Sequence, residues 1–273
     1  SAFTASEKDA WGAAAAGGAA AAGGAAAAGV APDARGARAQ RPRRAPIRFP
    51  TWNRGWAPAL FRRAALSFFL LPLTRVFAWI RVEGLDRLAA IDGPVVLAAN
   101  HQSHLDGPVV LAALPRGRRA RVAIAAAREW FGAYFHPERH SRRQRFAKGL
   151  SYNLAVLCFN VVPLPQREAG ARETLRYLGE LVEGGASVLI FPEGRRTREG
   201  EIAPFQPGVG MIASRLRLPV VPVRIEGLDR VLHQTWRMAR PGRVRVAFGA
   251  PIECPGDDYR AAARRIEQAV RRL

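Results

Sequence analysis

The chain has 273 residues, 49% of them hydrophobic, so it is long and apolar enough to bury a core and a globular protein is expected. Its 42 Lys and Arg against 22 Asp and Glu give a formal net charge of +20, which indicates an anionic partner: nucleic acid, a phospholipid surface or a phosphorylated substrate. Two cysteines exclude a disulfide framework and a zinc site built from Cys ligands.

Residues 1–45 are predicted to be a disordered Ala/Gly/Arg-rich tether. The tract has no bulky apolar side chain between Trp11 and Val30. It therefore cannot bury enough surface to offset the entropy lost on ordering. A secretory signal peptide is not expected either, because a basic start followed directly by a bulky apolar core is missing.

Residues 46–84 are predicted to be a membrane-associated helical segment, and WAPALFRRAALSFFLLPLTRVFAWIRV (56–82) is the most lipophilic stretch of the chain. Pro72 and Arg75 interrupt it well short of the roughly 20 apolar residues that a spanning helix needs. An interfacial helix pair is therefore expected, with an N-terminal core helix as the alternative. Four cations flank the stretch where anionic headgroups are expected, namely Arg62, Arg63, Arg75 and Arg81.

Residues 85–273 are predicted to form a single α/β domain. Helical patterns cover 173–182 and the chain end, where Asp257 is the expected helix cap. Several of the short apolar runs between the helices are apolar on both faces, which predicts a central, mostly parallel sheet flanked by helices. The predicted strands are 94–99, 122–127, 160–164, 186–191, 219–225 and 244–249.

The loop NHQSHLDG (100–107) carries the first candidate for chemistry. On a regular helix His101 and Asp106 would lie about 140° apart and could not meet. If the loop follows a strand and a helix begins near Gly107, Asp106 can fold back onto His101. The pair would then be a general base and the carboxylate that orients it.

A metal site is the alternative for the same loop, because H-x-x-H-x-D offers several ligand types and His136 and His140 are spaced for one helical face. The spacing differs from the H-x-H-x-D-H pattern of zinc hydrolases, and Gly107 stands where its last His would be. We therefore expect no metal and no cofactor. A purely structural His101 is a further alternative, and His104 is expected to be a loop or pocket-wall residue.

The stretch VLIFPEGRRTREG (188–200) is the second candidate, since it also ends a predicted strand. Gly194 would let a ligand approach the backbone closely. Arg195, Arg196 and Arg198 offer donors for a phosphate, and Glu193 offers a carboxylate for a hydroxyl.

Together these blocks resemble the glycerophospholipid acyltransferase family, whose members include the 1-acylglycerol-3-phosphate acyltransferases. NHQSHLD is similar to the family's N-H-x-x-x-x-D box, and FPEGRRT is similar to its F-P-E-G-T-R-S box. PFQPGVGMIA (204–213) and LPVVPVRIEG (218–227) stand where two further family blocks are expected. The resemblance covers about residues 80–255, with the four blocks in the family's order.

The resemblance implies a role for individual residues. His101 would take the proton from the acceptor hydroxyl as it attacks an acyl thioester, and Asp106 would orient it. Arg195 and Gln206 replace the usual Thr and Lys of their blocks, which alters the phosphate pocket. The residues that the resemblance assigns to substrate binding are Glu193, Gly194 and Arg196 for the glycerol phosphate, Arg167 for the phosphate, and Pro222 for the acyl-donor pocket.

The activity implied is transfer of a fatty acyl group from acyl-CoA or an acyl carrier protein to a lysophospholipid such as 1-acylglycerol-3-phosphate. We expect a peripheral or monotopic protein on the cytoplasmic face of the cell membrane. Residues 116–149 interleave Arg with aromatic residues, as suits an anionic membrane surface. Nucleic acid is the rival partner and is not expected, because no nucleic-acid motif accompanies the charge. A non-catalytic anionic-lipid-binding module and a metal-dependent hydrolase are the alternative functions.

Overall fold

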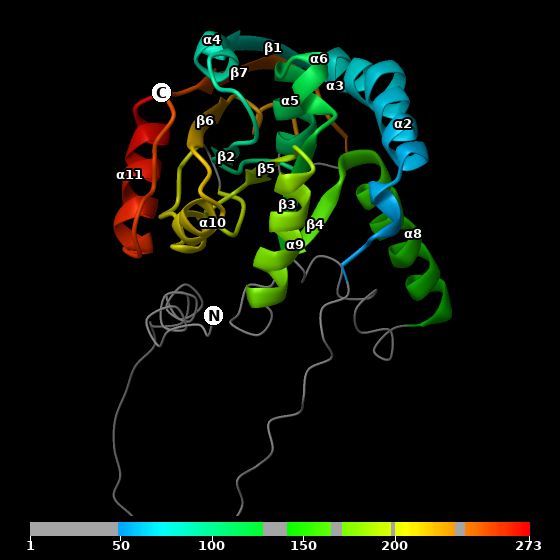
Figure 1. The fold of residues 1–273 in the computed structure, drawn as a ribbon. Helices are drawn as coiled ribbons and strands as arrows, with labels where there is room; N and C mark the ends of the chain where they lie inside the picture. Colours follow the sequence, from blue (N-terminus) through cyan, green and yellow to red (C-terminus); the bar gives the residue numbers. More distant parts are fainter. Residues whose placement is uncertain (1–48, 128–140, 165–170, 198–199, 233–237) are drawn as a thin grey trace, which may run out of the picture.

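A computed structural model describes residues 49–127, 141–164, 171–197, 200–232 and 238–273 (Figure 1). The predicted tether lies outside the described residues. The same is true of Arg167, of Arg198, and of His136 and His140.

Seven strands form a single sheet in the order β1-β7-β6-β2-β5-β3-β4. All neighbouring strands are parallel except β6 and β7, which are antiparallel. The predicted α/β fold with a mostly parallel sheet is confirmed, and β2 to β7 correspond to the six predicted strands. The strands are β1 (Ala78–Glu83), β2 (Val96–Ala99), β3 (Val122–Ala127), β4 (Val161–Leu164), β5 (Ser187–Ile190), β6 (Val220–Glu226) and β7 (Gly242–Phe248).

Helices cover both faces of the sheet (Figure 1). On β2, Leu97 and Ala99 pack into the core under α5, whereas Val96 and Ala98 pack into the core under α9, α10 and α11. This two-sided burial explains the continuous apolar run. The described helices are η1 (Trp52–Arg54), α2 (Trp56–Ala65), η2 (Leu66–Leu70), α3 (Leu71–Phe77), α4 (Leu85–Ala89), α5 (Asp106–Ala113), α6 (Arg116–Arg119), α8 (Arg142–Phe159), α9 (Ala171–Glu183), α10 (Gly208–Leu216) and α11 (Tyr259–Arg271).

The α2, η2 and α3 segments form one continuous helical run, with a π-helical turn in the middle. At that turn the Leu71 N–H bonds to the Leu66 carbonyl, five residues back. Pro72 accounts for the irregularity, because it has no N–H and its ring conflicts with the carbonyl four residues earlier. No helix among the described residues is long and apolar enough to cross a membrane.

This helical run leaves large apolar side chains exposed to solvent. Phe68 is 84% exposed and Phe69 is 68% exposed. We call the set the apolar helical surface, and it consists of Trp56, Leu60, Phe61, Phe68, Phe69, Leu73 and Val76.

Three details of the sequence-based prediction were wrong. Residues 78–82 were expected to belong to the helical segment but lie in β1, because pairing with β7 and burial of Ala78 at the strand's start override local helical preference. Arg62 was expected at a membrane surface but is 5% exposed and donates to the carbonyls of Leu157 and Asn53, at 3.0 Å and 3.1 Å. The N-cap of α11 was expected to be Asp257 but is Asp258, whose side chain accepts a hydrogen bond from the Ala261 N–H.

Candidate active site

The two predicted motifs meet at the carboxyl ends of neighbouring strands. The loop with His101 follows β2, and the loop with Glu193 follows β5, which pairs with β2. In a parallel sheet such loops emerge at the same edge, which is the usual place for a site in an α/β fold.

Asp106 folds back onto His101, as the loop sequence predicts. His101 Nδ1 lies 2.5 Å from Asp106 Oδ2, and the same oxygen accepts the N–H groups of Gln102 at 2.7 Å and Ser103 at 2.9 Å. Asp106 is the first residue of α5 and its side chain is wholly buried. The turn therefore fixes the carboxylate with three donors before any substrate arrives.

Burial raises the pKa of Asp106, and the nearby His101 and the N–H groups of Ser103 and Gln102 act in the opposite direction. With Nδ1 donating to Asp106, the Nε2 atom of His101 is left with a lone pair that can accept a proton. The imidazole stacks on Phe191, with ring centroids 4.4 Å apart, and 17% of its side chain is exposed. The ring is thus held in place but can be reached by a substrate.

Glu193 is buried and binds backbone groups of the protein. Its Oε1 accepts the N–H of His101 at 2.8 Å and its Oε2 accepts the N–H of Ala203 at 2.8 Å. Burial raises the pKa of Glu193, and these two N–H groups partly offset that effect. The Thr197 N–H donates to the carbonyl of His101 at 2.9 Å. The loop after β5 therefore holds the backbone of His101 from both sides, a role that sequence reasoning missed.

Gly194 and Arg196 lie in the same loop. Gly194 has φ +67°, a left-handed conformation that favours glycine in this turn. Burial lowers the pKa of Arg196 while the charge of Asp106 raises it, so the guanidinium lies near the His101–Asp106 pair. Burial lowers the pKa of His104, and the charges of Arg196 and His101 lower it further. Arg195 is exposed beside them.

Pro222 lies within the sheet rather than in the site loops. It is buried in β6 opposite Ala98 of β2. Asn100 lies nearer the site and was not assigned a role from sequence: its side chain donates to the Ile225 carbonyl at 2.9 Å and accepts the Ile225 N–H at 2.7 Å. Asn100 thus extends the β2–β6 pairing up to His101. The sequence did offer a signal for Asn100, because this polar residue stands directly between the predicted strand and His101.

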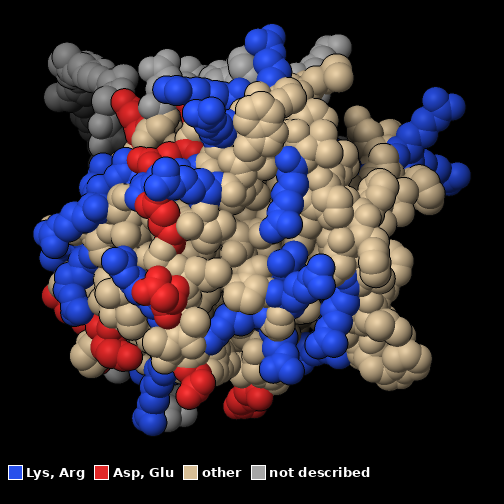
Figure 2. Space-filling model, turned by 90° about the horizontal axis from the view of Figure 1, so that it is seen from above, with Lys and Arg blue, Asp and Glu red and all other residues tan. Residues whose placement is uncertain are grey.

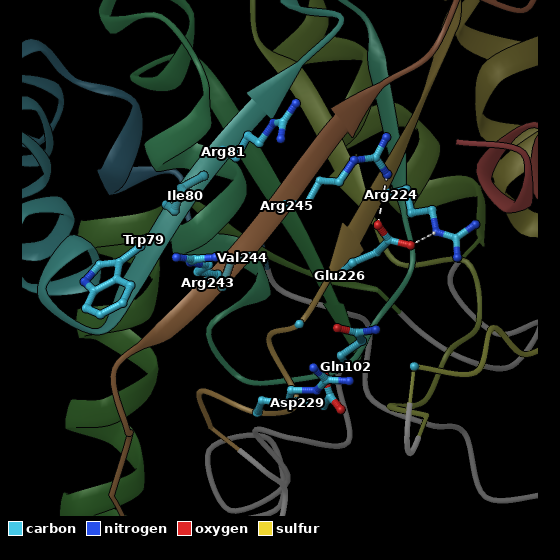
Figure 3. Close-up of a pocket in the computed structure, with 13 residues that line it drawn as sticks. Trp79, Ile80, Arg81, Gln102, Arg224, Glu226, Asp229, Arg243, Val244 and Arg245 are labelled. Carbon is cyan, nitrogen blue, oxygen red and sulfur yellow. Dashed lines mark hydrogen bonds and ion pairs between the residues drawn. The ribbon is translucent and has the colours of Figure 1, made fainter.

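A cavity of about 920 Å³ adjoins the loop at Gln102, the neighbour of His101 (Figure 3). Its other walls come from β1, β6 and β7, from the segment after β6, and from Gly200. Glu226 pairs there with Arg224 and with Arg245, at 2.9 Å in each case. Basic side chains outnumber acidic ones, since the cavity is lined by Arg81, Arg224, Arg230, Arg243 and Arg245 against Glu226 and Asp229. Such a cavity suits a substrate with negative charge.

No group of three or more His, Cys, Asp or Glu side chains that could hold a metal ion occurs within the described ranges.

The chain is similar in sequence to proteins named 1-acyl-sn-glycerol-3-phosphate acyltransferase. A 1-acyl-sn-glycerol-3-phosphate acyltransferase from Brassica napus chloroplasts is 30% identical over 63% of this chain and 44% of its own length. One from Pseudomonas aeruginosa is 26% identical over 78% of each chain. The chain thus spans less than half of the plant protein but most of the bacterial one.

The fold resembles the crystal structure of a 1-acyl-sn-glycerophosphate acyltransferase from Thermotoga maritima. The TM-score is 0.53 with 22% identity, covering 79% of this chain and 76% of that one. The family model described as Acyltransferase matches residues 79–226, which include both site loops and over half of the chain. On this match, the chain belongs to the acyltransferase family.

Proposed function

We propose that the protein transfers a fatty acyl group from a thioester to the free hydroxyl of a lysophospholipid, with 1-acylglycerol-3-phosphate as the preferred acceptor. The observation that carries the proposal is the pair of His101 and Asp106, 2.5 Å apart, with Asp106 buried and His101 reachable. Family membership and the names of the relatives support the reaction class and this acceptor.

The pair can perform the reaction without a covalent enzyme intermediate. His101 Nε2 accepts the proton of the acceptor hydroxyl while that oxygen attacks the thioester carbonyl carbon. The C–S bond then breaks, and the departing thiolate takes the proton back from the imidazolium. Asp106 stabilises the imidazolium in between and holds the ring so that Nε2 faces the substrate.

The remaining site residues are proposed to position the substrates. Arg196, beside the pair, would bind the acceptor phosphate together with Arg167, and Gly194 would let the phosphate approach the backbone. Glu193 would act by holding the loop of His101 rather than by touching the acceptor. Pro222 would shape the wall for the acyl donor, which we propose is acyl-CoA or an acyl carrier protein.

The location of the reaction is proposed to be the cytoplasmic face of the cell membrane, with the protein bound peripherally to anionic lipid. The apolar helical surface supports this, because exposed aromatic side chains on a helix are suited to the acyl–headgroup boundary. Arg63, Arg75 and Arg81, the cations predicted to flank this segment apart from the buried Arg62, suit anionic headgroups.

Thiol release from acyl-CoA in the presence of different acceptors tests the function. The acceptors would be 1-acylglycerol-3-phosphate, its choline and ethanolamine counterparts, and monoacylglycerol. We expect release that depends on an acceptor, is fastest with the phosphate monoester and is unchanged by EDTA. Release without any acceptor would indicate a thioesterase, and release abolished by EDTA and restored by zinc would indicate a metal-dependent enzyme.

A further inference from the structure

A second cavity, of about 300 Å³, lies between the N-terminal helical run and α6. It shares no lining residue with the cavity at Gln102. Arg63, Leu66 and Ser67 form one wall, and the other is formed by Arg116, Gly117, Arg119 and Ala120. The volume is at the lower end of the range for ligand sites, large enough for a phosphate and the atoms attached to it.

The described residues that line this cavity include three arginines and no carboxylate. Burial lowers the pKa of Arg119, and the charges of Arg75 and Arg116 lower it further, so a fourth arginine lies close by. Cations gathered in this way repel one another unless an anion lies among them. On the half of the upper face toward α2, α3 and α6, Figure 2 shows blue basic side chains and no red acidic ones.

Arg119 also has a buried donor that is not satisfied within the described part of the chain. Its Nε atom is inaccessible to solvent and has no hydrogen-bond partner there. A buried donor without an acceptor is costly, and a guanidinium group matches the oxygens of a phosphate in geometry and charge. An anion with several oxygens, placed among these guanidinium groups, would reduce the repulsion between them.

The surroundings of the cavity indicate where that anion comes from. Arg63, Leu66 and Ser67 line the cavity from the same helical run that carries the exposed side chains of the apolar helical surface. A phosphate at the cavity would contact a helical run that is suited to enter lipid. A lipid phosphate therefore fits better than a free one.

We propose that this cavity binds the phosphate group of an anionic phospholipid in the membrane, at a site separate from the His101–Asp106 pair. The proposal rests on the membrane location proposed above but not on the chemistry of the pair. Occupation of the site would fix how the protein lies on the bilayer.

Binding of the full chain to vesicles tests the site, using phosphatidylcholine alone or mixed with phosphatidylglycerol, which is neither substrate nor product of the proposed reaction. We expect Arg119→Gln to weaken binding to the mixed vesicles about tenfold, because the substitution removes one or two charge-assisted hydrogen bonds to the phosphate. Arg116→Gln, at an exposed position that tolerates substitution, should weaken binding severalfold. The matched control is Arg264→Gln, an exposed charge on α11, which should stay within about twofold.

Two further measurements test whether the bound phosphate belongs to a lipid and whether the site acts separately from the His101–Asp106 pair. Inorganic phosphate, added at constant ionic strength, should leave binding to the mixed vesicles unchanged; displacement of the protein would overturn the lipid assignment. Equal losses in Arg119→Gln and Arg264→Gln would show diffuse charge attraction and no site. Thiol release with acceptor in detergent micelles should persist in Arg119→Gln, so that a failure of this site is separated from a failure of the proposed activity.

Discussion

Asp106 concentrates three hydrogen bonds on one carboxylate oxygen. Oδ2 receives the His101 ring and the N–H groups of Gln102 and Ser103, while Oδ1 is buried with no hydrogen-bond partner in the described part of the chain. The pKa of Asp106 is nevertheless raised, because the cost of burial exceeds the effect of these donors. The residue is therefore held in a state that costs stability and serves the orientation of His101.

Asp106→Asn should separate these two effects. The amide can keep an oxygen at the Oδ2 position for the N–H groups of Gln102 and Ser103, but it removes the negative charge that stabilises the imidazolium, so the acyl-transfer rate should fall about 10³- to 10⁴-fold. Stability should not fall near neutral pH, since the variant no longer ionises a buried group.

The pH dependence of unfolding checks the second effect. A raised folded pKa means that the unfolded chain ionises first, so wild-type stability relative to the variant falls as pH rises above about 4. The unfolding temperature of Asp106→Asn minus that of wild type should therefore increase from pH 4 toward neutrality. A difference that shrinks over this range would mean that the carboxylate stabilises the fold.

Asn100 links the end of β2 to β6 through its side chain, which forms hydrogen bonds with the backbone of β6 in place of strand-to-strand pairing. It continues β2 into the site and binds both backbone groups of Ile225 in β6. Asn100→Ala leaves a buried N–H and a buried carbonyl without partners, so unfolding in urea should show a loss of about 1–3 kcal/mol. Asn153→Ala removes a side chain that donates to the Gly149 carbonyl of its own helix, and should stay within about 0.5 kcal/mol. Equal losses would rule out the linking role.

The helical run from α2 to α3 exposes its aromatic side chains instead of packing them. Phe68→Ser and Phe69→Ser should each weaken binding to neutral vesicles about ten- to hundredfold, because each removes a side chain worth about 1.5–3 kcal/mol on burial. Thermal unfolding should be unchanged, since both residues are exposed. Met238→Ser, which removes an exposed apolar side chain outside the run, is the control. Vesicle binding unaffected by either Phe substitution would place the membrane contact elsewhere.

Patterns within single elements predicted most of the fold, whereas contacts between distant elements decided the rest. Two-sided apolar runs identify β2 to β7, and the spacing of His101 and Asp106 predicts their contact. β1 was missed because its sequence resembles the helix before it, and only pairing with β7 makes it a strand. Arg62 was misplaced because its acceptors lie elsewhere in the chain, at Leu157 and Asn53.

The site was predictable to a similar degree. Its two loops were identified by their chemistry and by the resemblance to the acyltransferase family. The part played by Glu193 was not, because a carboxylate that binds backbone N–H groups looks the same in sequence as one that binds substrate.

At the scale of the whole molecule, the chain carries a large excess of cations, and the candidate active site lies at one edge of the sheet. The formal charge of +20 should add an attraction to anionic bilayers of about 1 kcal/mol for each cation near the surface. Binding to vesicles rich in phosphatidylglycerol should therefore fall steeply as NaCl is raised, because salt screens exposed charges. Binding to phosphatidylcholine vesicles, which depends on the apolar helical surface, should change little. A similar salt dependence for both kinds of vesicle would contradict the assignment of charge attraction to one and apolar contact to the other.

The most direct measurement is mass spectrometry of the lipid formed from acyl-CoA and 1-acylglycerol-3-phosphate by the wild-type protein and by His101→Gln. Wild type should form the diacyl phosphate, and the variant should form it at least about 10²-fold more slowly, because the acceptor hydroxyl loses its base. If the variant forms the same product at the wild-type rate, His101 is not the base and the proposed mechanism is wrong.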